Sequence, residues 1–171
     1  MMSVLKITGL ALVALCTTGM GMEMAFSLSQ RVRALELAQT VLESIAGELS
    51  YTLAPPEEII KSLTARTTLC KAGYLTACRS FCRKGVPFPQ AWNRAVREWK
   101  GALSARDREI LTAVSETLGT CSEKEALTAL EGAKRLLQEE LKNAREYAQV
   151  HGKLYRTLGM LSGVFLVILW I

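Results

Sequence analysis

Five cysteines and one histidine are the residues of this 171-residue chain best suited to metal or redox chemistry. A zinc site is one interpretation, because two of the cysteines are four residues apart and would share one face of a helix. Their spacing matches no known ligand pattern, however, so we favour small apolar side chains in a reducing compartment. The residues concerned are Cys16, Cys70, Cys78, Cys82, Cys121 and His151.

Motifs for catalysis are missing from the sequence. It contains no glycine-rich phosphate loop, no nucleophile elbow and no second histidine that could share a metal with His151. That histidine lies in a polar stretch beside an apolar C-terminal segment and needs no catalytic role there. We therefore predict that the protein is not an enzyme and that it uses no cofactor and no metal.

A basic stretch in the middle of the chain predicts a negatively charged partner. Residues 61–106 contain ten lysines and arginines and one acidic residue, Glu98. Such a stretch is either a solvated face or a surface that docks on an acidic protein or on anionic lipid. Nucleic acid is a third interpretation, with Trp92 and Trp99 stacking on bases, but their seven-residue spacing favours the core. The candidate partner-interface residues are Arg79, Arg83, Lys84, Arg94, Arg97 and Lys100.

The elements that must position these residues are helices. Apolar residues recur every three or four positions and no strand-like alternation occurs, so we predict an all-α fold. One stripe runs from Leu28 to Leu53 and ends at two consecutive prolines. A second stripe follows the turn-forming segment 85–89 and extends from Phe88 to Leu103.

Two pairs of serine and acidic residues predict helix starts. Ser104 with Asp107, and Ser122 with Glu125, have the spacing of a capping box. After Ser122 no proline occurs, so we expect one continuous helix about 75 Å long. The expected breaks between helices, at residues 55–56, 87–89 and 120–122, lie about 33 residues apart, close to the tetratricopeptide period. Because the signature of that repeat is missing, we predict a cytosolic antiparallel bundle of helix hairpins over residues 27–153.

Both ends of the chain are apolar enough to predict membrane anchors. We predict transmembrane helices at residues 4–24 and 155–171. The final stretch, 158–171, covers only roughly 21 Å of a roughly 30 Å apolar layer. Packing against the first helix and local thinning of the bilayer are expected to compensate. Small residues suited to such packing are Ala14, Thr18, Gly21, Gly159 and Gly163.

Flanking basic residues predict the side of the membrane that the bundle occupies. Arg31 and Arg33 follow the first segment and Lys153 precedes the second, so the positive-inside rule places residues 27–153 in the cytoplasm. The alternative is a cleaved signal peptide on an exported helical binding protein. Its cleavage signal is poor, because Glu23 stands where a small side chain is preferred.

Several ordered stretches resemble the stage III sporulation protein AB family of endospore-forming Firmicutes. They are RVRALELAQTVLESIAGELSYTLAPPEEI, KGVPFPQAWNRAV, SETLGT and KLYRTLGMLSGVFLVILWI. The resemblance extends over essentially the full length of the chain.

This resemblance implies a structural part of the channel between mother cell and forespore, required for endospore formation. The family is similar to the F-type platform proteins of type II secretion systems and type IV pili. It therefore implies a platform that couples a cytosolic secretion-type ATPase to membrane ring proteins, in the mother-cell membrane around the forespore. This chain has two short anchors and one bundle where platform proteins have more of each, so self-association is also expected.

Overall fold

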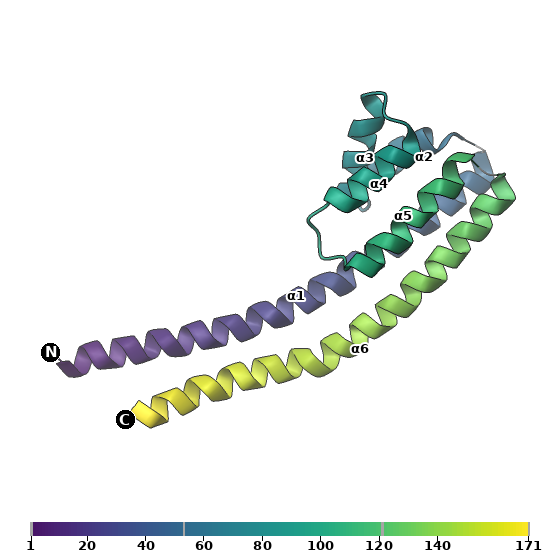
Figure 1. Ribbon diagram of the computed structural model, residues 1–171. Helices are drawn as coiled ribbons and strands as arrows, with labels where there is room; N and C mark the ends of the chain where they lie inside the picture. Colours follow the sequence, from purple (N-terminus) through teal and green to yellow (C-terminus); the bar gives the residue numbers. More distant parts are fainter. Residues whose placement is uncertain (1, 53, 121, 171) are drawn as a thin grey trace. The chain divides into compact units, whose positions relative to one another are not determined.

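The chain is all-helical in a computed structural model. The structure describes the backbone of residues 2–52, 54–120 and 122–170, and the side chains of residues 19, 22–51, 54–118, 122–155, 157, 158 and 161. Within these ranges it contains six helices and no strand, which confirms the predicted all-α fold. The helices are α1 (Met2–Thr52), α2 (Pro56–Ala65), α3 (Gly73–Arg83), α4 (Phe88–Glu98), α5 (Ala105–Thr120) and α6 (Glu123–Trp170) (Figure 1).

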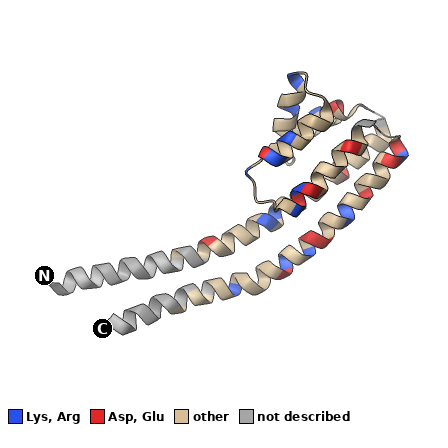
Figure 2. Cartoon of the chain, viewed as in Figure 1, with Lys and Arg blue, Asp and Glu red and all other residues tan. Residues whose placement is uncertain are grey.

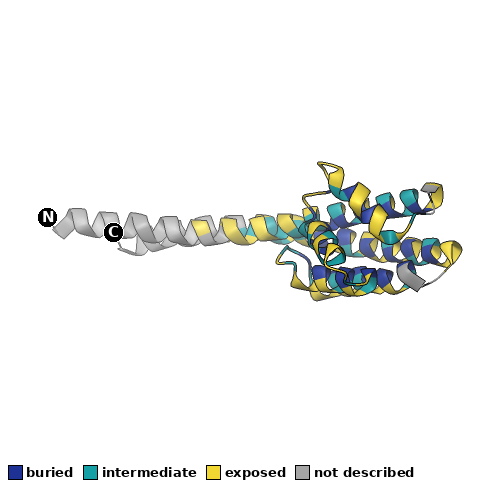
Figure 3. Cartoon of the chain, turned by 90° about the horizontal axis from the view of Figure 1, so that it is seen from above, coloured by how far each residue is buried: buried dark blue, intermediate teal, exposed yellow. Residues whose placement is uncertain are grey.

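The long helices α1 and α6 contribute to two compact units. The first, here called the terminal pair, consists of residues 1–32 and 143–171. The second, here called the helical body, consists of residues 33–142 and contains nearly all the buried side chains that the structure describes (Figure 3).

The predicted stripe of α1 forms one wall of the core of the helical body. Its buried residues are Leu35, Ala38, Val41, Leu42, Ile45 and Leu49. The helix ends at Thr52, and α2 begins at Pro56. Proline suits this first helical position because its fixed φ is helical and its missing N–H would have had no partner. Two acidic residues, Glu57 and Glu58, follow it in the first turn, where they favour the helix dipole.

The structure contains two breaks between helices that the sequence did not indicate. Residues 66–72 separate α2 from α3, although the sequence there contains no proline. The helix predicted from Phe88 to Leu103 ends at Glu98, because Trp99 adopts an extended conformation with ψ 124°. These extra breaks also remove the even spacing of turns that a tetratricopeptide array would require.

The indole of Trp99 explains the second break. A Cβ at Gly101 would lie 2.1 Å from this ring, and a Cβ at Gly73 would lie 2.8 Å from it. The backbone therefore passes the indole at two positions where only glycine fits. Arg108 holds the segment by donating to the main-chain oxygens of Arg97 and Gly101, at 2.9 and 3.4 Å.

The predicted capping box at Ser104 is complete, and one of the two hydrogen bonds of the box at Ser122 is present. The Asp107 N–H donates to the Ser104 hydroxyl at 3.1 Å, and the Ser104 N–H donates to the Asp107 carboxylate at 2.8 Å. At the start of α6, the Ser122 N–H donates to the Glu125 carboxylate at 3.1 Å. The continuous helix expected after Ser122 is confirmed as α6, with 48 residues.

Side-chain contacts join the helices of the helical body. The Trp92 indole of α4 donates to the Leu111 main-chain oxygen of α5 at 2.7 Å. The ring of Tyr74 in α3 packs edge-on against Trp92, with 5.7 Å between the ring centroids. An ion pair joins Lys134 of α6 to Glu43 of α1, with an N–O distance of 3.7 Å. These contacts fix α3, α4 and α5 around one core and tie α6 to α1.

The two predicted transmembrane helices are not tested by the structure. A search of the described residues finds no helix with a stretch long and apolar enough to cross a membrane. Most side chains of residues 4–24 and 155–171 lie outside the described ones.

Candidate partner-binding groove

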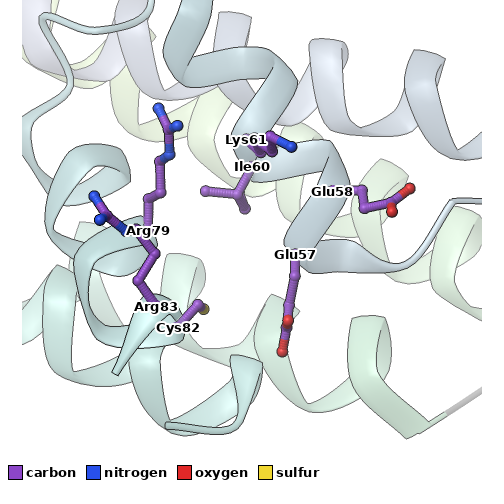
Figure 4. Close-up of a pocket in the computed structure, with 7 residues that line it drawn as sticks. All are labelled: Glu57, Glu58, Ile60, Lys61, Arg79, Cys82 and Arg83. Atoms are coloured by element: carbon purple, nitrogen blue, oxygen red, sulfur yellow. The ribbon is translucent and has the colours of Figure 1, made fainter. Parts of the chain in front are cut away.

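An open groove lies between α2 and α3 on the surface of the helical body. It has a volume of about 380 Å³ and continues along α2 towards Ala65. Figure 4 shows Arg79 and Arg83 of α3 on one side of it, with Ile60 and Glu57 of α2 on the other. The lining residues are Glu57, Glu58, Ile60, Lys61, Arg79, Cys82 and Arg83.

Helical periodicity places three cations around this groove. Arg79 and Arg83 are four residues apart on α3 and therefore share one face of that helix, and Lys61 projects from α2. Arg79 donates to the Thr64 hydroxyl at 3.0 Å, which is a neutral partner. Within the described part of the chain, neither Lys61 nor Arg83 forms an ion pair. The groove therefore presents positive charge that a partner could neutralise.

The acidic end of the groove lies beside two thiols. Burial raises the pKa of the Cys78 thiol, and the neighbouring Cys82 and Glu57 act in the same direction. Burial is also the largest cause of the raised pKa of Cys82. Both sulfurs therefore stay protonated at neutral pH and are poor nucleophiles. No cluster of three or more metal-binding side chains occurs among the described residues.

The six predicted interface residues do not all meet in one place. Arg79 and Arg83 share the groove, and Lys84 is exposed at the C-terminal end of α3. Arg94 of α4 pairs with Glu98 at 2.8 Å and lies over the Phe81 ring, 4.7 Å from its centroid. The other two, Arg97 and Lys100, are exposed at the C-terminal end of α4 and just beyond it. In Figure 2 the ribbon is blue at the positions of lysine and arginine.

Sequence reasoning missed part of the groove. Lys61 belonged to the basic stretch but not to the six candidates, and Glu57 and Ile60 were not considered as partner contacts. The spacing of Glu57, Ile60 and Lys61 could have indicated them, because residues three and four apart lie on one face of a helix. The paired helix could not have been identified, because the break at 66–72 was not predicted.

The tryptophans of the basic stretch have structural roles. Trp92 is fully buried, which confirms the prediction that it belongs to the core. Trp99 is half-buried and packs edge-on against Tyr74, with 5.4 Å between the centroids. Since neither ring is fully exposed, neither offers an open stacking platform for a base.

The predicted membrane-packing residues are not tested by the structure. The side chains of all five lie outside the described ones. They are Ala14, Thr18, Gly21, Gly159 and Gly163.

Fold and groove together define an all-α protein whose helical body carries a groove lined by charged side chains. The chain belongs to the stage III sporulation protein AB family, whose model matches residues 6–171. It is 23% identical over 168 residues to stage III sporulation protein AB of Bacillus subtilis (strain 168), covering 96% of this chain and 98% of that protein. A solved structure of a stage III sporulation protein AB shares the fold, with a TM-score of 0.58 and 21% identity over 70% of this chain and 96% of that one. The family resemblance seen in the sequence is thus confirmed, and a role in sporulation follows.

Proposed function

We propose that this protein is a membrane-anchored platform of the channel between mother cell and forespore. In this role the helical body docks a cytosolic secretion-type ATPase and couples it to membrane ring proteins. The family supports the sporulation role, and the apolar ends of the sequence support anchoring in the mother-cell membrane around the forespore. The observation that carries the docking role is the α2–α3 groove, where Lys61, Arg79 and Arg83 form no ion pair within the described part of the chain.

Binding of the channel's ATPase to the full-length protein in detergent tests the docking role. The double charge reversal R79E/R83E should weaken binding at least about tenfold, because it replaces attraction with repulsion at the groove. R97E/K100E is the matched control, since it makes the same change in net charge on exposed residues outside the groove. An equal loss in both variants would show that overall charge, rather than the groove, governs binding.

Thiol labelling in intact non-sporulating cells that express the protein tests the side of the membrane on which the helical body lies. Cys70 is exposed on the helical body and serves as a native reporter. A membrane-impermeant maleimide should label it only after the cells are permeabilised. Labelling of intact cells would place the body outside the cytoplasm and would favour the exported alternative.

Loss of the gene tests the role as a whole. A deletion strain should fail to complete endospores, and a gene encoding the wild-type chain should restore them. Normal spore yield in the deletion strain would contradict the proposal.

A further inference from the structure

The C-terminal half of α6 has three distinct faces along the described residues 143–161. At about 100° per residue, positions three or four apart share a face. One face is buried or half-buried within the terminal pair: Ala144, Ala148, His151 and Tyr155. A second is polar and exposed: Arg145, Gln149 and Lys153. The third, here called the apolar seam, consists of Tyr147, Val150, Leu154, Leu158 and Leu161.

The apolar seam is open although its side chains are large. Its members are between 47% and 65% exposed. Their spacings of three, four, four and three residues average 3.5, so Tyr147, Leu154 and Leu161 take one core position of a coiled-coil heptad, Val150 takes the other, and Leu158 lies beside the core. A contiguous row of exposed apolar side chains of this kind marks an interaction surface.

Lipid alone does not account for the first half of the seam. Tyr147, Val150 and Leu154 lie at the same heights along α6 as Glu146, Gln149 and Lys153. A bilayer deep enough to cover the apolar three would also enclose the polar three, and two of those carry a charge that is costly in hydrocarbon. A second helix covers one face only and leaves the polar face in water.

We infer that the apolar seam packs against the same seam of a second copy of this chain, forming a parallel two-helix interface. In a parallel pair with Tyr147 and Leu154 at one core position of the heptad, Glu146 of one chain lies opposite His151 of the other. Glu146 forms no ion pair in the described part of the chain, and the His151 ring is held on Tyr147 with 3.9 Å between centroids. The carboxylate and imidazole at the two edges are thus complementary between copies. The parallel orientation rests on the proposed anchoring of both copies in one membrane, whereas the seam itself does not.

Cysteine cross-linking in native membranes tests this interface. V150C and L154C, each in a full-length chain carrying C70S, should form disulfide-linked dimers on mild oxidation. Q149C and K153C are the matched controls, because they are exposed at the same heights on the polar face. Equal cross-linking on both faces, or stronger cross-linking on the polar face, would overturn the interface. The absence of disulfide-linked dimers for V150C and L154C would also overturn the interface. Quenching of a fluorescent probe at Val150 by lipid would then show that the seam faces the bilayer.

Light scattering of the full-length protein in detergent provides an independent measurement. V150E/L154E should weaken self-association by about a hundredfold or more, since it places unpaired charges in the interface. Q149E/K153E should leave the mass of a dimer, and circular dichroism should show both variants folded. An unchanged mass for V150E/L154E would overturn the interface. Because these positions lie outside the α2–α3 groove, the variant should still bind the ATPase, so failure here is distinguishable from failure of the docking role.

Discussion

The indole of Trp92 in α4 donates a 2.7 Å hydrogen bond to the main-chain oxygen of Leu111 in α5, while its ring is fully buried. A helix carbonyl thereby accepts from a side chain as well as from its own helix. This bond determines how far α4 can rotate against α5, and α4 in turn holds α3. The wall of the groove that carries Arg79 and Arg83 therefore depends on a residue that lies outside the groove.

Replacing Trp92 with Phe should destabilise the helical body. The variant loses the bond to Leu111 and leaves space that the indole filled, for an expected loss of about 1–3 kcal/mol in the free energy of unfolding. Urea unfolding of the full chain, followed by circular dichroism, measures this loss. Tyr51→Phe is the control, because Tyr51 is 90% exposed and should tolerate the change. A free energy of unfolding unchanged in Trp92→Phe would contradict the structural role of the bond.

Replacing Tyr74 with Phe should leave stability unchanged or raise it by up to about 1 kcal/mol. The Tyr74 hydroxyl is buried and finds no hydrogen-bond partner among the described residues. Removing it therefore removes a desolvation cost and loses no bond. Thermal unfolding at pH 7 measures the effect, and a clear loss of stability would reveal a bond to this hydroxyl.

The stability of Tyr74→Phe and of the wild-type chain should respond differently to alkaline pH. Burial raises the pKa of Tyr74 above its ordinary value near 10. The folded state favours the neutral form of Tyr74. The contribution of this preference to the free energy of unfolding is therefore fully present below about pH 10 and is lost as the pH rises further. The wild-type chain should therefore lose more stability than Tyr74→Phe between pH 9 and about 11. Parallel pH profiles would show that Tyr74 does not titrate differently on unfolding.

Gly101→Ala should destabilise the chain by about 1–3 kcal/mol, because its Cβ would lie 2.1 Å from the Trp99 ring and force the indole or the backbone to move. Gly132→Ala is the matched control. Gly132 is an exposed interior residue of α6 with nothing within 4 Å of its Cβ position. Alanine there should stabilise the helix by up to about 1 kcal/mol. If both variants gave the same thermal midpoint, the close approach at Trp99 would be wrong.

The cysteines should differ sharply in reactivity. Cys70 is exposed, whereas Cys78 is buried with a raised pKa. A maleimide at pH 7.5 should modify Cys70 at least about tenfold faster than Cys78 in the folded protein, since both access and thiolate fraction favour it. Mass spectrometry of peptides over time measures the two rates. Equal rates in urea and unequal rates without it would confirm that the fold is the cause.

Local backbone chemistry explains which elements were predictable. Helix ends in the structure are marked by Pro55 and Pro56 at the start of α2, by the segment 85–89 and by the capping residues at Ser104 and Ser122, because each acts through residues near in sequence. Gly85 is an example, since it follows α3 with φ +82°. Burial along α1 was predictable for the same reason, as its stripe needs only helical periodicity.

Tertiary contacts explain what the sequence did not predict. The break at 66–72 contains no strong helix breaker, yet Leu69 and Ala72 within it are buried against the body. The early end of α4 depends on Trp99 meeting Gly73, which is distant in sequence. The sequence showed that residues 61–106 are basic, but it did not show which of these lysines and arginines lie together in the structure. Arg94 is engaged by Phe81 and Glu98, while Lys61 joins Arg79 and Arg83 only because α2 lies beside α3.

The hold of Arg108 on the main chain before α5 has a practical consequence for anyone labelling this protein. Its guanidinium bridges the end of one helix and the loop to the next, contacting the oxygens of Arg97, Gly101 and Leu103. A fluorescent protein or affinity tag inserted between residues 99 and 104 would pull these oxygens away from a single side chain. The loop between α4 and α5 is thus among the poorest insertion points in the helical body.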